Sequence, residues 1–389
     1  MSGPAVARPA RGTRPANRRE LIVAAASELF YRKGYANVAM GEVAEAVAIG
    51  PSALYRHFRG KHGLLATVVA GALQTLDDAL AVARPDQVAA TLATTVLGHR
   101  QVGVLWRRES RHLVDAERAA FRVQARRIGG RTAELVGTAR PELAAQQRDV
   151  LAWSALSVAN SVSFHSLSLP EPEFSALLTD LVGRVLDATP TALGASDEPA
   201  RRAPLAARSR REAILVEATK LFARQGFTGV SVEDIGAGAG IAGPSVYNHF
   251  AGKADILAAA IVRGGEWLRM DLNRALARAA DPQDALRRIL HSYCAFGFEN
   301  PHLVQTLVSE TRHLPTAEQD RARAAQRAYI AEWVYLLRKV HPEWEPVAAR
   351  VRVQAVQVMV NDTARTPHLR AQAGMDVAAA TIGAHVLGL

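Results

Sequence analysis

Apolar residues recur at helical spacing along almost the whole chain. Ile22, Ala26 and Phe30 fall at i, i+4 and i+8, which places them on one face of a helix. Gly34 follows this run, at a position where a helix favours a left-handed C-terminal cap. Alternation of apolar and polar residues over the length of a strand does not occur. The pattern therefore predicts an all-α fold.

The same pattern occurs twice. At an offset of 192 residues, 19–65 align with 211–257 without a gap, and the octapeptide LYRHFRGK returns as VYNHFAGK. A weaker match relates ESRHL, which begins at Glu109, to ETRHL, which begins at Glu310, at an offset of 201. The second copy therefore carries an insertion between the two blocks. We expect two whole protomers in series, each a small N-terminal module followed by a larger helical domain.

Composition indicates where the two copies are joined. Residues 187–209 hold three prolines, Gly194 and few apolar side chains, which is typical of an extended linker. The expected segments, in order, are a basic arm at 1–17, a first small module at 18–65, a first helical domain at 66–188, a linker at 189–209, a second small module at 210–257 and a second helical domain at 258–389.

Each small module contains three short predicted helices, in the first copy at about 18–33, 40–47 and 51–58. A tight connection joins the last two helices. This is a helix-turn-helix, in which the second helix enters the major groove of DNA. In that helix Leu54 and Phe58 lie at i and i+4, so we expect them to face the core of the module.

The opposite face of this helix carries groups that suit DNA. Hydroxyl, guanidinium and phenol groups bond base edges and phosphates, and a lysine at the start of the next helix can hold a phosphate. A solvated surface arginine is the structural alternative. The histidines lie nearer the core face, where a bond to a neighbouring carbonyl fits as well as a DNA contact. The candidate DNA-binding residues are Ser52, Ala53, Tyr55, Arg56, His57 and Lys61 in the first module and Pro244, Ser245, Tyr247, Asn248, His249 and Lys253 in the second.

The N-terminal caps of the middle helix differ between the modules. Ser231 with Asp234 forms a capping box, whereas the first copy has Ala39 with Glu42. A lost cap costs about 0.5–2 kcal/mol where nothing compensates for it. We therefore expect one module to bind DNA less tightly than the other.

Composition narrows the class of protein. The net charge is +10 and the pI about 10.2, which favours a polyanionic partner such as nucleic acid. The one cysteine, Cys294, excludes an internal disulfide and fits a reducing cytoplasm. Neither a run of about 18 uncharged apolar residues nor an apolar N-terminal segment occurs, so we expect no membrane span and no secretory signal.

Both small modules resemble the N-terminal module of the TetR-type bacterial repressors. The resemblance rests on LIVAAASELFYRKGYANVAMGEVAEAVAIGPSALYRHFRGKHGLL in the first copy and on ILVEATKLFARQGFTGVSVEDIGAGAGIAGPSVYNHFAGKADIL in the second. The chain is also similar to the double-TetR regulators of actinobacteria. VLWRRESRHL and HSLSLP resemble segments of the mycobacterial regulator of a mammalian-cell-entry (lipid import) operon. TetR-type proteins are normally homodimers of chains about half as long, so the resemblance implies an intramolecular pseudo-dimer that is a monomer in solution.

The resemblance further implies an apolar or acyl-type effector, because the larger TetR-type domain buries such a ligand. The last two helices of that domain pair with the partner chain, so 148–167 and 174–188 would pair here with 348–364 and 375–389. Plain core packing is the alternative for the aromatic side chains of these domains. The candidate ligand-binding residues are Trp106, Phe121, Trp153, Phe164 and His165 in the first half and Tyr293, Phe296, Phe298, Trp333 and Tyr335 in the second.

The leading hypothesis is a ligand-responsive repressor of lipid uptake or catabolism genes, which binds double-stranded operator DNA in the cytoplasm. The alternative is a helical interaction protein with decayed modules, which the uncapped Ala39, Gly50 and Ala242 favour. Hydrolase, metalloprotease and reactive-cysteine motifs are absent, and the glycines of GAGAGIAG follow a helix pattern and not a strand. We therefore expect no enzymatic activity, catalytic residue, metal site or cofactor.

Two pairs of charged residues recur in the helical domains. Glu109 with Arg111 and Glu310 with Arg312 are expected to be ion pairs at helix ends, and an interaction with a polar group of the ligand is the alternative.

The two copies differ at one position of the predicted DNA face. Arg56 suits O6 and N7 of guanine, whereas Asn248 suits N6 and N7 of adenine. If both modules read DNA, a single chain should occupy two unlike half-sites; neutral drift of an unused module is the alternative. Phosphate contacts beside the modules are expected from the basic arms, which carry Arg8, Arg11, Arg14, Arg201 and Arg202.

Overall fold

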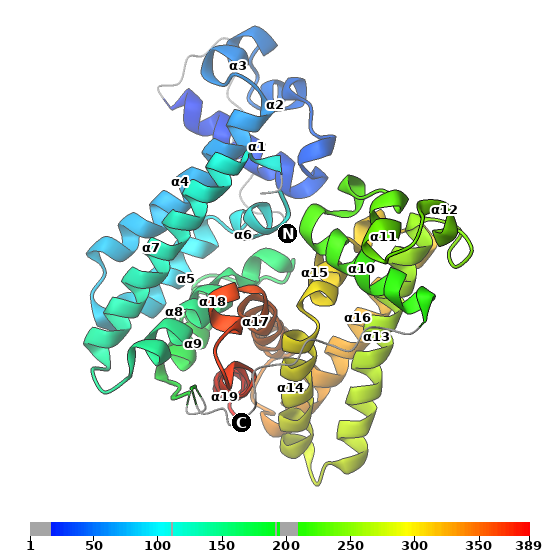
Figure 1. Ribbon diagram of the computed structural model, residues 1–389. Helices are drawn as coiled ribbons and strands as arrows, with labels where there is room; N and C mark the ends of the chain where they lie inside the picture. The colour runs from blue at the N-terminus through cyan, green and yellow to red at the C-terminus, as the bar shows by residue number, and fades with distance from the viewer. Residues whose placement is uncertain (1–16, 110–111, 191–192, 195–208) are drawn as a thin grey trace. The chain divides into compact units, whose positions relative to one another are not determined.

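The computed structural model describes residues 17–109, 112–190, 193–194 and 209–389. This part of the chain is helical and has no strands, so the predicted all-α fold is confirmed (Figure 1). The elements of the first half are α1 (Arg18–Lys33), η1 (Tyr35–Asn37), α2 (Met40–Ala46), α3 (Pro51–His57), α4 (Lys61–Val82), η2 (Pro85–Gln87), α5 (Val88–Gly98), α6 (Val102–Val104), the π-helical turn η3 (Leu105–Glu109), α7 (Asp115–Ala139), α8 (Ala145–Asn160), η5 (Ser161–Phe164) and α9 (Glu173–Asp187).

The second half has a similar order of elements. Its elements are α10 (Arg210–Gln225), η6 (Phe227–Gly229), α11 (Val232–Gly238), α12 (Gly243–Val246), α13 (Lys253–Arg278), α14 (Pro282–Glu299), α15 (Pro301–Ser309), η7 (Thr311–His313), α16 (Thr316–Val340), α17 (Pro346–Arg365), α18 (Pro367–Arg370) and α19 (Met375–Leu387). Helices α1 to α3 and α10 to α12 are the two small modules.

The chain forms two compact units, which do not coincide with the two halves of the repeat. The first unit contains the described residues up to 142 together with 159–166, and the second contains 143–158 and the described residues from 167 onward. Most of α8 and the whole of α9 therefore pack with the second half of the sequence.

Each small module shares one hydrophobic core with the larger domain that follows it. In the first unit this core joins Phe30 and Leu54 of the module to Leu105 of η3. In the second unit it joins Phe222 of the module to Val304 of α15. The position of each module is therefore tied by packing to the helices beside it.

Within the second unit, α9 contacts α17 and α19. The Asp180 carboxylate of α9 lies 2.8 Å from the guanidinium of the buried Arg352 on α17. The ring of Trp344 covers the same guanidinium, with 4.0 Å between Cζ of Arg352 and the ring centroid. Asp149 of α8 lies 3.3 Å from the His368 imidazole of α18. The contacts of α9 with α17 and α19 join segments that were expected to pair, whereas His368 lies outside those segments.

Both glycines that follow the first helix of a module have a positive φ. Gly34 has φ 81° and ψ 147°, and Gly226 has φ 77° and ψ 158°. The predicted positive φ is confirmed, but the extended ψ shows that the prediction of a left-handed helical cap is wrong. This conformation is almost restricted to glycine. In it, the Gly34 N–H still closes the helix on the carbonyl of Phe30 at 3.0 Å.

One described helix, α4, is long and apolar enough to cross a membrane by length and composition. Its residues Leu64, Leu65 and Val68 are buried in the core of the first unit. Core packing therefore accounts for part of the apolar character of α4, since 33% of its apolar window is buried.

Candidate nucleic-acid interface

Helix α3 separates apolar from polar side chains in the way that its spacing predicts. Leu54 and Phe58 are buried, with exposed fractions of 0% and 5%. Tyr55, Arg56 and His57 are all exposed. His57 is the last residue of α3 and is exposed, so its surface is open to a DNA contact.

The second module presents the equivalent side chains on a shorter helix. α12 spans only Gly243–Val246, and the N–H groups of Tyr247 and Asn248 extend it by bonding carbonyls three residues earlier, each at 3.3 Å. Tyr247, Asn248 and His249 are exposed, whereas Phe250 is buried.

The remaining candidates lie beside these exposed triplets. Ser52 and Pro244 are exposed, and Ala53 and Ser245 are half-buried. Each module therefore presents hydroxyl, phenol and imidazole groups around one variable position, which is Arg56 in the first module.

The turn before the recognition helix has similar backbone geometry in both modules, since Ala48 has φ 55° and Gly240 has φ 69° at the matching position. In the second module this turn is also unusually tight. A Cβ on Gly236 would lie 3.0 Å from backbone atoms of Gly243 and 3.1 Å from the carbonyl oxygen of Ile241. Close packing of α11 on α12 therefore explains these glycines, and no phosphate-binding loop is needed to account for them.

Only the second module has a complete capping box, as predicted. The Ser231 hydroxyl accepts a hydrogen bond from the Asp234 N–H at 3.0 Å, and the Asp234 carboxylate accepts one from the Ser231 N–H at 2.9 Å. In the first module the Glu42 carboxylate accepts a hydrogen bond from the Ala39 N–H at 2.8 Å. The methyl side chain of Ala39 cannot accept the reciprocal hydrogen bond from the Glu42 N–H. The N-terminus of α2 thus has half of the cap that α11 has.

Lys61 and Lys253 begin α4 and α13, as expected, but their ammonium groups bind the protein itself. Lys61 Nζ donates to the carbonyl of Tyr35 at 2.8 Å. Lys253 Nζ donates to the carbonyls of Phe227 at 2.7 Å and Val230 at 2.6 Å. Burial lowers the pKa of Lys253. The position of these lysines at a helix start predicts a phosphate contact, but it gives no sign that their ammonium groups bond carbonyls more than 20 residues earlier in the chain. The phosphate contact stays a prediction.

Two further arginines reach the recognition segments. The guanidinium of Arg19 on α1 lies 5.2 Å from the centroid of the Phe58 ring, and that of Arg211 on α10 lies 4.5 Å from the Phe250 ring. Such cation–π contacts contribute about 0.5–1 kcal/mol at exposed sites. The arginine and the phenylalanine of each contact recur at matching positions of the repeat, and this recurrence is the signal in the sequence by which the contacts could have been found. The basic arms that carry Arg8, Arg11, Arg14, Arg201 and Arg202 lie outside the described residues.

The candidate ligand residues of the first half lie in different places. Trp106 and Phe121 pack edge to face, with 6.1 Å between ring centroids, in the core shared with the first module. Phe164 is half-buried and His165 is buried. Trp153 belongs to the second compact unit. The ring of Trp153 packs edge to face on the His368 ring within that unit, with 5.3 Å between centroids. The role of these five side chains in ligand binding stays a prediction.

In the second half, Tyr293 and Trp333 belong to one buried aromatic cluster. Their ring centroids lie 5.9 Å apart, and Tyr329 packs against both rings. The Tyr293 hydroxyl donates a hydrogen bond to Oδ1 of Asn361 at 3.0 Å. This cluster, formed by Tyr293, Tyr329 and Trp333, joins α14 to α16.

The other three candidates of the second half are not part of this cluster. Phe296 packs in the core shared with the module, and Phe298 is also buried. Tyr335 is 59% exposed. It follows the buried Trp333 by two residues, a rotation of about 200° around the helix, so it lies on the outer face of α16. The expectation that Tyr335 lines an interior pocket is therefore wrong.

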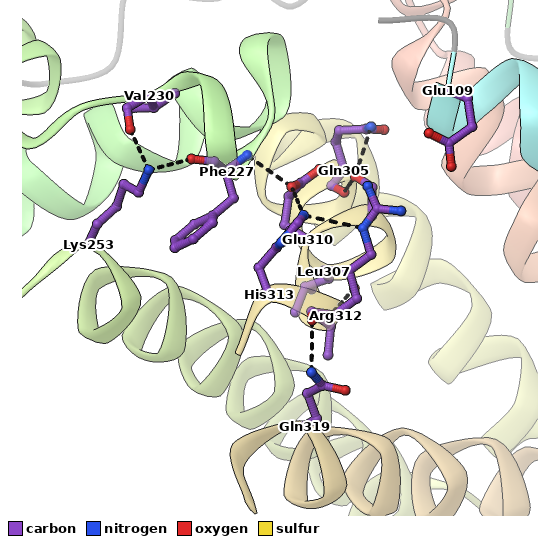
Figure 2. A network of polar contacts seen from close by, with 12 residues as sticks. Glu109, Phe227, Val230, Lys253, Gln305, Leu307, Glu310, Arg312, His313 and Gln319 are labelled. Atoms are coloured by element: carbon purple, nitrogen blue, oxygen red, sulfur yellow. Dashed lines mark hydrogen bonds and ion pairs between the residues drawn. The ribbon is translucent and has the colours of Figure 1, made fainter. Parts of the chain in front are cut away.

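Glu109 and Glu310 are buried at the ends of equivalent segments (Figure 2). Each carboxylate lies 3.5 Å from Nε2 of the histidine three residues later, His112 or His313. Arg111, the expected partner of Glu109, lies outside the described residues. These contacts agree with a structural role for both glutamates.

Comparison with known families gives two matches. The family described as bacterial regulatory proteins of the tetR family matches residues 22–68 and again residues 214–260. Both matches contain a helix-turn-helix and the start of the helix that follows it. Comparison with curated protein sequences gives no match.

Solved structures of TetR-family regulators each resemble a little less than half of this chain. A regulator from Bordetella parapertussis is 19% identical, covers 46% of this chain and 95% of its own, and has a TM-score of 0.42. PfmR from Thermus thermophilus is 25% identical, with coverages of 47% and 98% and a TM-score of 0.41. The ketosteroid transcriptional regulator of Mycobacterium tuberculosis is 21% identical, with coverages of 48% and 97% and a TM-score of 0.38. The two family matches identify residues 22–68 and 214–260 as tetR-family DNA-binding modules, which this all-α chain carries in tandem.

Proposed function

We propose that the chain is a ligand-responsive repressor that reads an asymmetric operator through two unlike recognition faces. The observation that carries the proposal is the exposed triplet Tyr55-Arg56-His57 and its exposed counterpart Tyr247-Asn248-His249. Both triplets keep a phenol and an imidazole and differ at the central position. Arginine pairs best with guanine and asparagine with adenine, so the two modules prefer different bases.

If both modules read DNA at one operator, the two halves of the chain must pair with each other in the way that the two subunits of a homodimer do. The packing of α9 against α17 and α19 supports this intramolecular pseudo-dimer. The contact between Asp180 and Arg352 favours this particular pairing of α9 with α17, because a buried guanidinium is stable only with a partner for its charge. The protein acts in the cytoplasm as a single chain on its operator.

The proposed effector is a small apolar or acyl-type molecule, and the proposed targets are lipid uptake or catabolism genes. The aromatic cluster of Tyr293, Tyr329 and Trp333 supports an apolar ligand, and the resemblance to double-TetR regulators supports the gene class. A ligand releases DNA only if its affinity differs between the DNA-bound and free conformations. Native mass spectrometry and calorimetry against acyl-coenzyme A and sterol panels should find a binder that weakens DNA binding. Absence of any binder, or binding without an effect on DNA, would contradict lipid control.

Selection of duplexes from a random-sequence pool tests the DNA-binding function. The full chain should enrich a defined sequence, and the logarithm of its affinity should fall linearly with the logarithm of salt concentration, because phosphate contacts release counterions. A helical interaction protein with decayed modules would enrich no sequence. That outcome would favour the alternative function.

A further inference from the structure

Phe227 is the point at which the second DNA-binding module meets its helical domain (Figure 2). Its N–H donates a hydrogen bond to the Glu310 carboxylate at 2.9 Å, and its carbonyl accepts one from Lys253 Nζ at 2.7 Å. The His313 ring stacks on the Phe227 ring, with 5.3 Å between centroids and 18° between planes. The Lys253 ammonium lies 4.4 Å from the centroid of the same ring. We name Phe227, Lys253, Glu310 and His313 the second junction cluster.

Glu310 connects two parts of the protein. It follows α15 in the helical domain, and its bond to Phe227 crosses to the loop after α10 in the module. Its side chain is almost completely buried, and a buried carboxylate is stable only with hydrogen bonds or a countercharge. Removing the Glu310 carboxylate therefore breaks a bond between domain and module and leaves the Phe227 N–H without that acceptor.

The contacts continue from the junction into the core of the helical domain. Nε2 of Gln319 on α16 donates to the carbonyl of Arg312 at 2.8 Å (Figure 2). It also donates to the carbonyl of Leu314 at 2.8 Å. The same helix carries Tyr329 and Trp333 of the buried aromatic cluster. Helix α16 therefore carries residues of the aromatic cluster and also contacts the segment that follows α15.

In the first unit, the lysine, the histidine and the aromatic ring at the matching positions are arranged in the same way. The Lys61 ammonium lies 4.5 Å from the centroid of the Tyr35 ring, and the His112 ring stacks on that ring at 4.7 Å. Glu109 is buried and lies 3.5 Å from His112. Burial of Tyr35 and the negative charge of Glu109 raise the pKa of Tyr35. Tyr35, Lys61, Glu109 and His112 form the first junction cluster.

The two parts of each cluster come from separate blocks of the repeat. The aromatic residue and the lysine recur at an offset of 192, whereas the glutamate and the histidine recur at an offset of 201. Despite the insertion between the blocks, the histidine stacks on the aromatic ring in both clusters. In contrast, the central residue of the recognition face has changed from Arg56 to Asn248. The chain has kept the junction while the surface that reads DNA has diverged.

We infer that Glu310 and His313, with Glu109 and His112, are positioning residues that hold each DNA-binding module on its helical domain and couple the two. All four lie outside the recognition helices, so their effect on DNA is exerted through the module that they hold. The inference rests on the proposed function and adds the residues through which the effector domain and the module communicate. Coupling of this kind requires a contact whose strength changes with the position of the module.

The test compares Glu310→Ala with Glu310→Gln in the full chain, with Glu318→Ala as the matched control. Gln retains an oxygen that can accept from the Phe227 N–H. Glu318 is a partly exposed carboxylate of α16 that pairs with Arg321. Amide hydrogen exchange of residues 226–231 reports the junction. Affinity for a duplex selected by the wild-type chain reports DNA binding, and base preference in each half-site reports which module is affected.

Glu310→Ala should speed exchange at 226–231 and weaken DNA binding by about tenfold, the effect expected when one buried hydrogen-bond acceptor is removed. The loss should fall on the half-site of the second module, while Glu109→Ala affects the half-site of the first. In exchange rate and in DNA affinity, Glu310→Gln should lie closer to wild type than Glu310→Ala does. Glu318→Ala should match wild type in both. Melting of the far-UV circular dichroism signal checks that each variant remains folded.

Faster exchange at 226–231 with unchanged DNA affinity would overturn the coupling, because the module would be loosened without consequence. Unchanged exchange at 226–231 would overturn the junction itself. A wild-type chain that selects no DNA would instead count against the proposed function. The exchange data on Glu310→Ala would still decide whether Glu310 holds the module, so the two failures are distinguishable.

Discussion

Ala48 and Gly240 occupy the same place in the turns of the two helix-turn-helix modules, and both have a positive φ. An L-residue in this region is strained by about 1–2 kcal/mol, whereas glycine is not. Ala48→Gly should therefore stabilise the first module by about 1 kcal/mol, and Gly240→Ala should destabilise the second by a similar amount. Native-state hydrogen exchange of α2 and α11 measures both changes in the full chain.

Gly252→Ala is the control for this pair. Gly252 has an extended φ of −177°, and neither Gly252 nor Gly240 has another atom within 4 Å of its Cβ position. Only Gly240→Ala therefore introduces backbone strain. An equal loss of stability in the two variants would show that the φ of Gly240 is not the cause.

Arg56 is expected to read a base directly. Arg56→Ala should lower discrimination at one position of the first half-site by about 1–3 kcal/mol, and Asn248→Ala should do so at one position of the second. Sequencing of DNA selected by each variant measures the base preferences. Arg32→Ala, which removes an exposed guanidinium from α1, should leave them unchanged. Unchanged preferences in Arg56→Ala would show that Arg56 does not read a base.

At the scale of single elements, the caps of α2 and α11 offer a reciprocal pair of substitutions. Ala39 has φ −90° and ψ 150°, close to the φ −94° and ψ 165° of Ser231, so a serine at 39 would already have cap geometry. Ala39→Ser should stabilise α2 by about 0.5–2 kcal/mol, and Ser231→Ala should destabilise α11 by the same range. Hydrogen exchange of the first turn of each helix reports both effects. No gain from Ala39→Ser would mean that the half-box with Glu42 is already sufficient.

Sequence reasoning succeeded where an element depends on its own residues. The burial of Leu54 and Phe58 follows from their spacing on one short helix, and the capping box of Ser231 follows from residues three apart. It was wrong or incomplete where distant segments decide. The carbonyls that bind Lys253 belong to a different element, and Tyr335 faces outward because the neighbours of α16 cover its other side. Aromatic character alone contains no information about which face of a helix is covered.

At the scale of the whole molecule, the internal repeat predicted two protomers but not the division into compact units. That division assigns 143–158 and 167–187, which include most of α8 and α9, to the unit of the second half. Packing of apolar helix faces from distant segments produces it, and a sequence offset has no bearing on such packing. In the proposed pseudo-dimer, the two halves of one chain present unlike faces, and an operator without two-fold symmetry is expected, since a closed homodimer presents two identical faces.

The number of chains on one operator tests the central claim most directly. Footprinting on a selected duplex, combined with native mass spectrometry of the complex, gives the protected sequence and the stoichiometry together. We predict one chain on two unlike half-sites whose centres lie about 34–36 Å apart, or a multiple of that distance. Asn248→Ala should alter only one of the two half-sites. A palindromic site that binds two chains, each through one module, would contradict the account.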